Sequence, residues 1–237
     1  MARTDSPTLE DCLAIQNTMD GNVLRRFMTI GTCGPCVQLG DYIDKCMEFN
    51  PTGTIEETEL CNMSLVTWVP QCRVPILLIS LGDACTAVCI QETGNVYYAT
   101  ETISLPAKTP AGCILLAHYT EDVIDSHRRP RVLVYDVVTW GTSMSSSAYA
   151  QRIQYEDLST VAPEERYRIL REELGPLLHS CTATSNTIVL QWVGYIDGAR
   201  KFLDGTIHVG HEVETLLELS RENALRPKLL RDPDVKL

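Results

Sequence analysis

The sequence predicts an α+β fold, in which a central antiparallel sheet carries flanking helices and follows a small N-terminal helical region. From residue 65 onward, short apolar runs alternate with turn residues such as Gly82-Asp83, which is typical of antiparallel strands joined by tight hairpins. Residues 163–179 repeat apolar side chains at helical spacing. We therefore divide the 237-residue chain into an N-terminal helical region, residues 1–62, and a sheet-bearing domain, residues 63–237.

The N-terminal region is expected to hold three short helices. Ser6-Pro7 supplies an N-cap and a first-turn proline for a helix that continues to about Met19. A second helix is expected over residues 37–49, because Asn50-Pro51 disfavours its continuation, and a short acidic helix is expected over residues 56–62.

The domain is expected to contain seven strands and two longer helices. The helix over 163–179 should place its arginines on a polar face, and a second helix is expected over 209–222. The apolar runs between turn residues predict strands at 65–69, 75–81, 84–91, 95–99, 112–119, 132–138 and 187–193.

Charge and hydropathy limit the partners that the chain can have. The net charge of −11 argues against binding an extended nucleic-acid tract, because such proteins present many cations to the phosphates. A pocket for one nucleotide needs only a few local donors and stays possible, as does a protein partner with a basic surface. The sequence has no run of about 18 apolar residues, so we expect no membrane span.

The ten cysteines are expected to be reduced thiols. The N-terminus lacks the charged-then-apolar pattern of a secretory signal, so we expect a cytoplasmic or nuclear location, or both. Nothing in the sequence calls for a cofactor.

Five segments between residues 65 and 220 resemble, in order and spacing, the nucleotidyltransferase superfamily of RNA capping enzymes and polynucleotide ligases. The segments are Trp68-Val-Pro70, the hairpin 75–90, Asn95–Ala99 with Ser104-Leu-Pro106, Gly112–Leu115 and Leu133–Trp140. The resemblance is closest to the cap-binding domain of snurportin, because of Trp140 above all. It implies a nucleotidyltransferase-like sheet.

Two departures from this family remove covalent catalysis. Family members attack the α-phosphate with the lysine of a Lys-x-Asp-Gly motif, and the corresponding stretch here, Val69–Val74, has no lysine. Arg73 cannot replace it, because a guanidinium stays protonated. The family's acidic strand reads Ala111-Gly112-Cys113. The resemblance therefore implies a non-catalytic module that binds an RNA cap or nucleotide, or a protein scaffold in an RNA-related complex.

A cap-like ligand needs aromatic faces for a cationic base and donors for phosphate. The large faces are Trp68, Trp140 and Trp192, with Tyr97 as a smaller one and Arg73 as a donor. We take these five residues as the candidate ligand-binding set, although a tryptophan in an apolar strand is usually a core residue. The densest basic patch, Arg128, Arg129 and Arg131, is more typical of a solvated loop.

A thiol–disulfide function is the alternative interpretation. Cys33-Gly34-Pro35-Cys36 is the dithiol sequence of thioredoxins, and the helix expected from residue 37 would lower the pKa of Cys33. Cys33 and Cys36 could instead bind zinc with Cys46 and Cys61, but only the first pair has typical ligand spacing.

His208 and His211 could ligate a metal from one face of a helix. No supporting pattern of cysteines or acids accompanies them, apart from Glu212 and Glu214. Two solvated histidines at a helix start are the favoured interpretation, and we predict no metal site.

Overall fold

The computed structural model describes a sheet-rich region that begins at residue 53. The helices expected within residues 1–52, and the cysteines at 33, 36, 46 and 61, lie outside the described residues. The described ranges are 53–60, 63–71, 73–80, 85–90, 96–98, 105–106, 108–110, 113–124, 126–141, 155–180 and 187–231.

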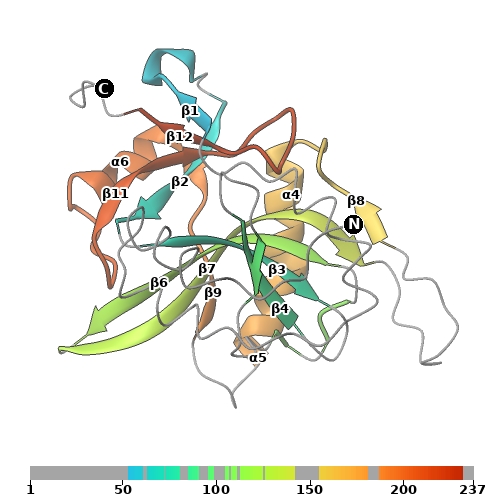
Figure 1. Cartoon of the computed structure of the whole chain (residues 1–237). Helices are drawn as coiled ribbons and strands as arrows, with labels where there is room; N and C mark the ends of the chain where they lie inside the picture. The colour runs from blue at the N-terminus through green and yellow to red at the C-terminus, as the bar shows by residue number, and fades with distance from the viewer. Residues whose placement is uncertain are drawn as a thin grey trace, which may run out of the picture.

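A seven-stranded sheet forms the larger half of the described structure. Its strands follow the order β5-β4-β3-β6-β7-β8, and β9 pairs in parallel with β7. The long ribbon of β6 and β7 extends beyond the rest of this sheet (Figure 1). The strands are β3 (Val74–Ser80), β4 (Cys85–Ile90), β5 (Val96–Tyr98), β6 (Ile114–Ile124), β7 (His127–Gly141), β8 (Tyr155–Asp157) and β9 (Ile188–Leu190).

A five-stranded sheet joins the first and last described parts of the chain. Its order is β1-β12-β11-β2-β10, and β1 pairs in parallel with β12, with Gly53 opposite Lys228. Figure 1 shows blue β1 and red β12 side by side. The strands are β1 (Gly53–Ile55), β2 (Leu65–Pro70), β10 (Gly194–Tyr195), β11 (Val213–Glu218) and β12 (Lys228–Leu230).

Successive side chains of a strand point to opposite faces of its sheet, and this alternation builds three apolar layers. On β3, Ile76 and Leu78 face the helices that cover one side of the seven-stranded sheet, whereas Leu77 and Ile79 face the five-stranded sheet. On β2, Trp68 faces away from that inner layer, toward a third cluster. Every residue of β2 and β3 is buried, which explains their continuous apolar sequences.

Short helices cover the two outer faces. Leu170 and Leu174 pack on the seven-stranded sheet, and Phe202 packs on the five-stranded sheet. The turn before Pro176 is π-helical, because proline has no N–H for the usual bond and its ring crowds the preceding turn. The helices are the 3-10 helix η1 (Glu57–Glu59), α4 (Pro163–Ile169), the π-helical turn η2 (Leu170–Leu174), α5 (Gly175–Ser180) and α6 (Ile196–Leu203).

The expected α+β class is confirmed, whereas the expected C-terminal helix is wrong. The helix expected over 209–222 is replaced by strand β11, whose residues pair with β2 on one side and β12 on the other. The glutamates and leucines of this segment favour a helix locally, but pairing within the sheet overrides that preference. Helix α6 falls where no element was expected. No helix of the described ranges is long and apolar enough to cross a membrane.

The expectation that the arginines of the 163–179 helix lie on a polar face is wrong for Arg166. Its side chain is fully buried and holds Asp136 of β7 through two bonds, Nε to Oδ1 at 2.9 Å and Nη2 to Oδ2 at 2.8 Å. Arg166 also donates to the carbonyls of Val161 and Ser220. Arg168, in contrast, is exposed. The Asp136–Arg166 pair therefore joins helix, sheet and the segment after β11 inside the core.

Candidate functional site

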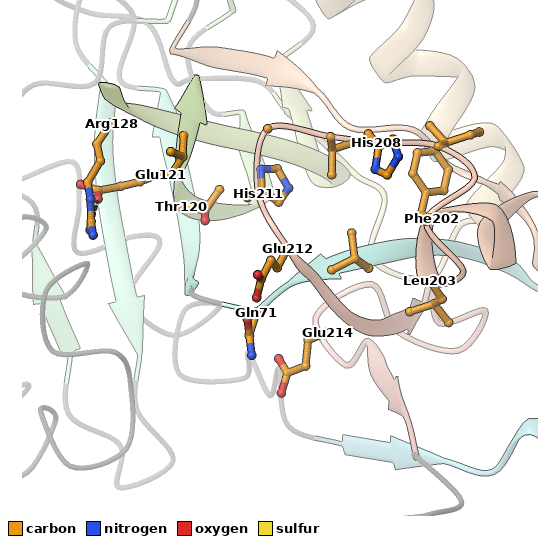
Figure 2. A pocket seen from close by; sticks show the side chains of 16 residues that line it. Gln71, Thr120, Glu121, Arg128, Phe202, Leu203, His208, His211, Glu212 and Glu214 are labelled. Carbon is orange, nitrogen blue, oxygen red and sulfur yellow. Dashed lines mark hydrogen bonds and ion pairs between the residues drawn. The ribbon is translucent and has the colours of Figure 1, made fainter. Parts of the chain in front are cut away.

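A cavity of about 950 Å³ lies between the ends of β6 and β7 and the segment that joins α6 to β11. This volume falls within the usual range of small-ligand pockets. Figure 2 shows Thr120, Glu121 and Arg128 on one side, and Phe202, Leu203 and His208 on the other. The lining residues are Gln71, Thr120, Glu121, Val123, Arg128, Phe202, Leu203, Gly205 and 207–214.

Part of the cavity wall is apolar and exposed. Val123, Leu203 and Ile207 keep 58, 42 and 40% of their surfaces accessible, and all three line the cavity. They are three of the five exposed large apolar side chains among the described residues. Single exposed apolar residues are ordinary, but a group around one hollow is typical of an interaction site.

The polar part of the wall is acidic. Among the described lining residues, the carboxylates of Glu121, Glu212 and Glu214 and the guanidinium of Arg128 carry formal charges that sum to −2, or to −1 when Arg73 at the edge is included. Arg128 contacts Glu121 at 3.3 Å, and Arg73 forms an ion pair with Glu214. The exposed Glu212 makes no ion pair with any described residue. Its backbone carbonyl is nevertheless fixed by the N–H of Gln71 at 2.9 Å.

The segment 203–214 is held in one conformation by local bonds. The N–H of Thr206 donates to Asp204 Oδ1 at 2.8 Å, and the N–H of Ile207 donates to the carbonyl of Lys201 at 2.8 Å. Gly205 has φ +73°, which a residue with a side chain rarely adopts. Hydrogen bonds from the side chain and then the backbone of Thr206 hold the pKa of Asp204 below its usual value. The exposed apolar side chains are thus presented on an ordered loop.

His211 ties this segment to β6. Its Nδ1 lies 2.7 Å from Asp122 Oδ1, and the second oxygen of Asp122 accepts from Arg131 Nε at 2.6 Å. The carbonyl of Gly210 accepts from Val123 N–H at 2.7 Å. A β-carbon on Gly210 would lie 2.6 Å from Asp122 Cγ, so only glycine allows this approach. Burial lowers the pKa of His211, although the bond to Asp122 opposes that shift.

Buried polar residues continue from His211 into the space between the sheets. His211 packs on Trp68, whose carbonyl accepts from Gln191, and His118 stacks on Tyr135 with ring centroids 4.7 Å apart. Burial, reinforced by Arg73, lowers the pKa of His118 well below its usual value, and burial raises that of Tyr135. These rings are therefore neutral in the folded protein at pH 7.

Trp68 and Trp192 come together behind the cavity rather than in its lining. Both contact Phe202, with centroid distances of 5.9 and 5.2 Å. Trp192 packs against two glycines, since β-carbons on Gly194 and Gly198 would lie 2.4 and 2.9 Å from its ring. Phe202 is the aromatic residue of this group that reaches the cavity wall.

The other three residues of the predicted ligand-binding set lie elsewhere. Arg73 donates to the carbonyl of Pro70 at 3.1 Å and pairs with Glu214 at the edge of the cavity. Trp140 packs against the cluster on the helix-covered face of the seven-stranded sheet. Tyr97 belongs to β5, the first strand in the order of that sheet. None of the five predicted residues is among the cavity-lining residues.

The expected basic patch is distributed along β7. Arg128 and Arg131 pair with Glu121 and Asp122 of the neighbouring strand, so they do not form a common surface for phosphate. Arg129 is exposed on the same strand.

The expected helix start at His208 and His211 is wrong, because both residues precede strand β11. His208 is exposed, as expected, whereas His211 is half-buried against Asp122. Across the described ranges, no group of three or more His, Cys, Asp and Glu side chains could hold a metal ion.

The thiol and zinc hypotheses concern residues outside the described ranges and stay predictions. Cys113, which lies within those ranges, is buried and forms no disulfide. Burial raises its pKa to about 12, against a smaller opposing effect of the Gly141 N–H, which donates to its sulfur at 3.3 Å. A thiol with so high a pKa is unreactive near neutral pH.

The sequence matches no protein-family model, and no curated protein shows significant similarity to it. The site must therefore be interpreted from its own chemistry. It has a partly apolar wall beside carboxylates, and one of these, Glu212, makes no ion pair with the described residues.

Several cavity residues carried no distinct signal in the sequence. Phe202 and Leu203 fell in a stretch without an expected element, and Glu121 lay at the end of an expected strand. Their common location depends on pairing between β2 and β11, whose residues are about 150 positions apart in the chain. The sequence shows histidines next to acidic residues over His208–Glu214, but it did not predict that this segment leads into a strand.

Proposed function

We propose that this chain is a non-catalytic, nucleotidyltransferase-like binding module that serves as an interaction scaffold for a protein partner in an RNA-related complex. The cavity beside segment 203–214 is the binding site, and the partner presents a basic surface to it. The observation that carries this proposal is the gathering of Val123, Leu203 and Ile207 around a cavity whose carboxylates outnumber its cations.

Charge favours a protein partner over a phosphate-bearing ligand. A nucleotide brings several negative charges, and the one guanidinium of the wall, Arg128, is already next to Glu121. The carboxylate of Glu212 would repel the phosphates further. A lysine or arginine side chain meets the opposite situation, because Glu212 makes no ion pair with the described residues and part of the wall is apolar.

An RNA cap is the second candidate function. A methylated guanine base is cationic, and Phe202 supplies an aromatic face in the cavity wall. The two tryptophans nearest to the cavity lie behind Phe202, so a cap would have a single aromatic partner there unless these rings rearranged.

The non-catalytic part of the proposal is supported by the sequence. No lysine occurs between Val69 in β2 and Val74, the first residue of β3, and the residues at the position of the family's acid are Ala111-Gly112-Cys113. The order of the resembling segments along β2, β3, β6 and β7 supports the family assignment.

Amide chemical shifts of the ¹⁵N-labelled protein test the proposed function. The probes are a hexa-arginine peptide, a hexa-glutamate peptide, methylated cap analogues, GTP and ATP. We expect hexa-arginine alone to shift the amides of Ile207, His211 and Glu212. Shifts at these amides caused only by a cap analogue would replace the proposed function with the second candidate, and shifts away from the cavity would refute both.

A further inference from the structure

The two chemical parts of the cavity wall are separated in space, which limits what the partner can present. Figure 2 shows Leu203 and Phe202 on one side, with Glu212 and Glu214 lying beside Gln71 away from them. A ligand that satisfies both parts must therefore carry an apolar group and a cation at a distance from each other. Neither a bare cation nor a purely apolar surface matches the whole wall.

Glu212 defines the position of the cation. Arg73 neutralises Glu214, and Arg128 lies next to Glu121, so Glu212 is the cavity carboxylate without an ion pair among the described residues. The bond from Gln71 N–H to its carbonyl fixes the backbone from which this side chain extends. An incoming guanidinium or ammonium thus meets an anchored carboxylate.

Ile207 and Leu203 define the position of the apolar group. Both are exposed, and both lie on a segment ordered by the bonds to Asp204 and Lys201. Ordering before binding lowers the entropic cost of association.

We propose that the cavity binds a linear segment of a partner protein in which an apolar side chain lies within a few residues of an arginine or lysine. The inference rests on the proposed function and narrows it to one type of peptide. The cation pairs with Glu212, and the apolar side chain covers Ile207 and Leu203.

A positional-scanning library of fluorescein-labelled hexapeptides tests this inference through fluorescence anisotropy with the full chain. We expect selection of Arg or Lys at one position and of Leu, Ile, Met or Phe one to three positions away. The best single peptide is then titrated against variants. Glu212→Gln should weaken binding roughly three- to tenfold and reduce its salt dependence, since a rim ion pair is screened by salt.

Ile207→Ser should weaken the same peptide by a similar factor without changing its salt dependence. Two matched controls lie outside the cavity: Glu222→Gln removes an exposed carboxylate, and Met63→Ser removes an exposed apolar side chain. Both controls should bind within about twofold of the unmodified protein. Circular dichroism confirms that each variant is folded.

The outcomes separate this inference from the function on which it rests. Selection of cations alone, or of apolar residues alone, overturns the paired recognition and leaves a protein-binding module in place. If Glu212→Gln and Glu222→Gln weaken peptide binding equally, the cation does not pair with Glu212 in the cavity. An absence of any selected peptide, with binding of a cap analogue, overturns the inference and the proposed function together.

Discussion

Two Asp–Arg pairs connect neighbouring elements of this fold, and they differ in how completely they are enclosed. Asp136 and Arg166 are fully buried and bond to each other through both carboxylate oxygens. Asp122 and Arg131 lie in a more open region, and Asp122 divides its oxygens between Arg131 and His211. The first pair is surrounded by core, whereas the second supports the wall of a cavity.

The difference shows how one pair of residue types serves folding at one place and a binding surface at another. The guanidinium of Arg166 also donates to the carbonyls of Val161 and Ser220, so the pair is satisfied from within the protein. Asp122 instead orients His211 and thereby positions the segment that carries Glu212 and Ile207. We expect changes at the first pair to unfold the protein and changes near the second to alter the cavity.

The largest expected effect is that of Arg166→Met. It leaves the Asp136 carboxylate buried without its partner, which should lower the free energy of unfolding by about 3–5 kcal/mol. Urea denaturation followed by circular dichroism measures the change.

The double variant Asp136→Leu with Arg166→Met is the control for this prediction. Because it removes both charges, it should recover much of the stability lost in Arg166→Met. Arg168→Met, at an exposed ion pair with Glu165, should leave stability nearly unchanged, because solvent screens such a pair. A loss in Arg166→Met as small as that in Arg168→Met would show that the buried pair does not stabilise the core.

The sequence predicted the seven-stranded sheet well, because its central strands are long and buried. The apolar runs at 75–81, 112–119 and 132–138 correspond to β3, β6 and β7, which are recognisable from local composition alone. The partner of Asp136 was not predictable. Arg166 lies four residues before Leu170 and eight before Leu174, so helical spacing places it with the buried leucines, but its residue type argued for a polar face, and the carboxylate that allows its burial is 30 residues away.

The five-stranded sheet and the cavity were much less predictable. Strands β1, β10 and β12 have two or three residues each, too short for a periodic pattern, and β1 meets a strand from the far end of the chain. The aromatic residue types drew attention to Trp68, Trp140 and Trp192, which pack in apolar clusters. The cavity depends on exposed aliphatic residues and glutamates, whose significance appears only when the chain is folded.

Gly210→Ala has the second largest expected effect and separates cavity shape from overall folding. The new β-carbon would lie 2.6 Å from Asp122 Cγ, so the segment must move away from β6. We expect a loss of about 1–3 kcal/mol in unfolding free energy, as for other overpacked sites. The amides of Val123 and His211 should shift in ¹⁵N spectra.

Gly53→Ala is the matched control for Gly210→Ala, because its β-carbon would have ordinary contacts, the nearest at 3.5 Å to Lys228. It should leave the amides of the cavity unchanged. Equal spectral changes in the two variants would mean that the close approach of Gly210 to Asp122 does not shape the cavity.

The free energy of unfolding should fall in mild acid, because the histidines near the Asp122–Arg131 pair, His118 and His211, are buried and half-buried respectively. Burial lowers the folded-state pKa of His118, and also that of His211. The unfolded chain then binds more protons than the folded chain, so the unfolding free energy decreases as the pH drops below about 6.5, the unfolded value. Each histidine contributes a slope of at most about 1.4 kcal/mol per pH unit. Urea titrations between pH 7.5 and 5 measure this slope.

His118→Phe tests the origin of the pH dependence. Phenylalanine keeps a ring against Tyr135 and removes the titrating group, so the slope should become smaller even if the absolute stability changes. The same substitution at His127, whose side chain is exposed, should leave the slope as it is in the unmodified protein. An unchanged slope in His118→Phe would assign the acid sensitivity to other groups.

The smallest expected effect is that of Glu212→Gln on stability, and it completes the contrast between the two regions. Glu212 is exposed and makes no ion pair with the described residues, so its neutralisation should change the unfolding free energy by less than about 0.5 kcal/mol. Urea denaturation of this variant, in parallel with Arg166→Met, measures the difference. If Glu212→Gln lowered stability as much as a core substitution, its carboxylate would belong to the folding of the domain. A negligible change in stability together with weakened peptide binding would place Glu212 in recognition instead.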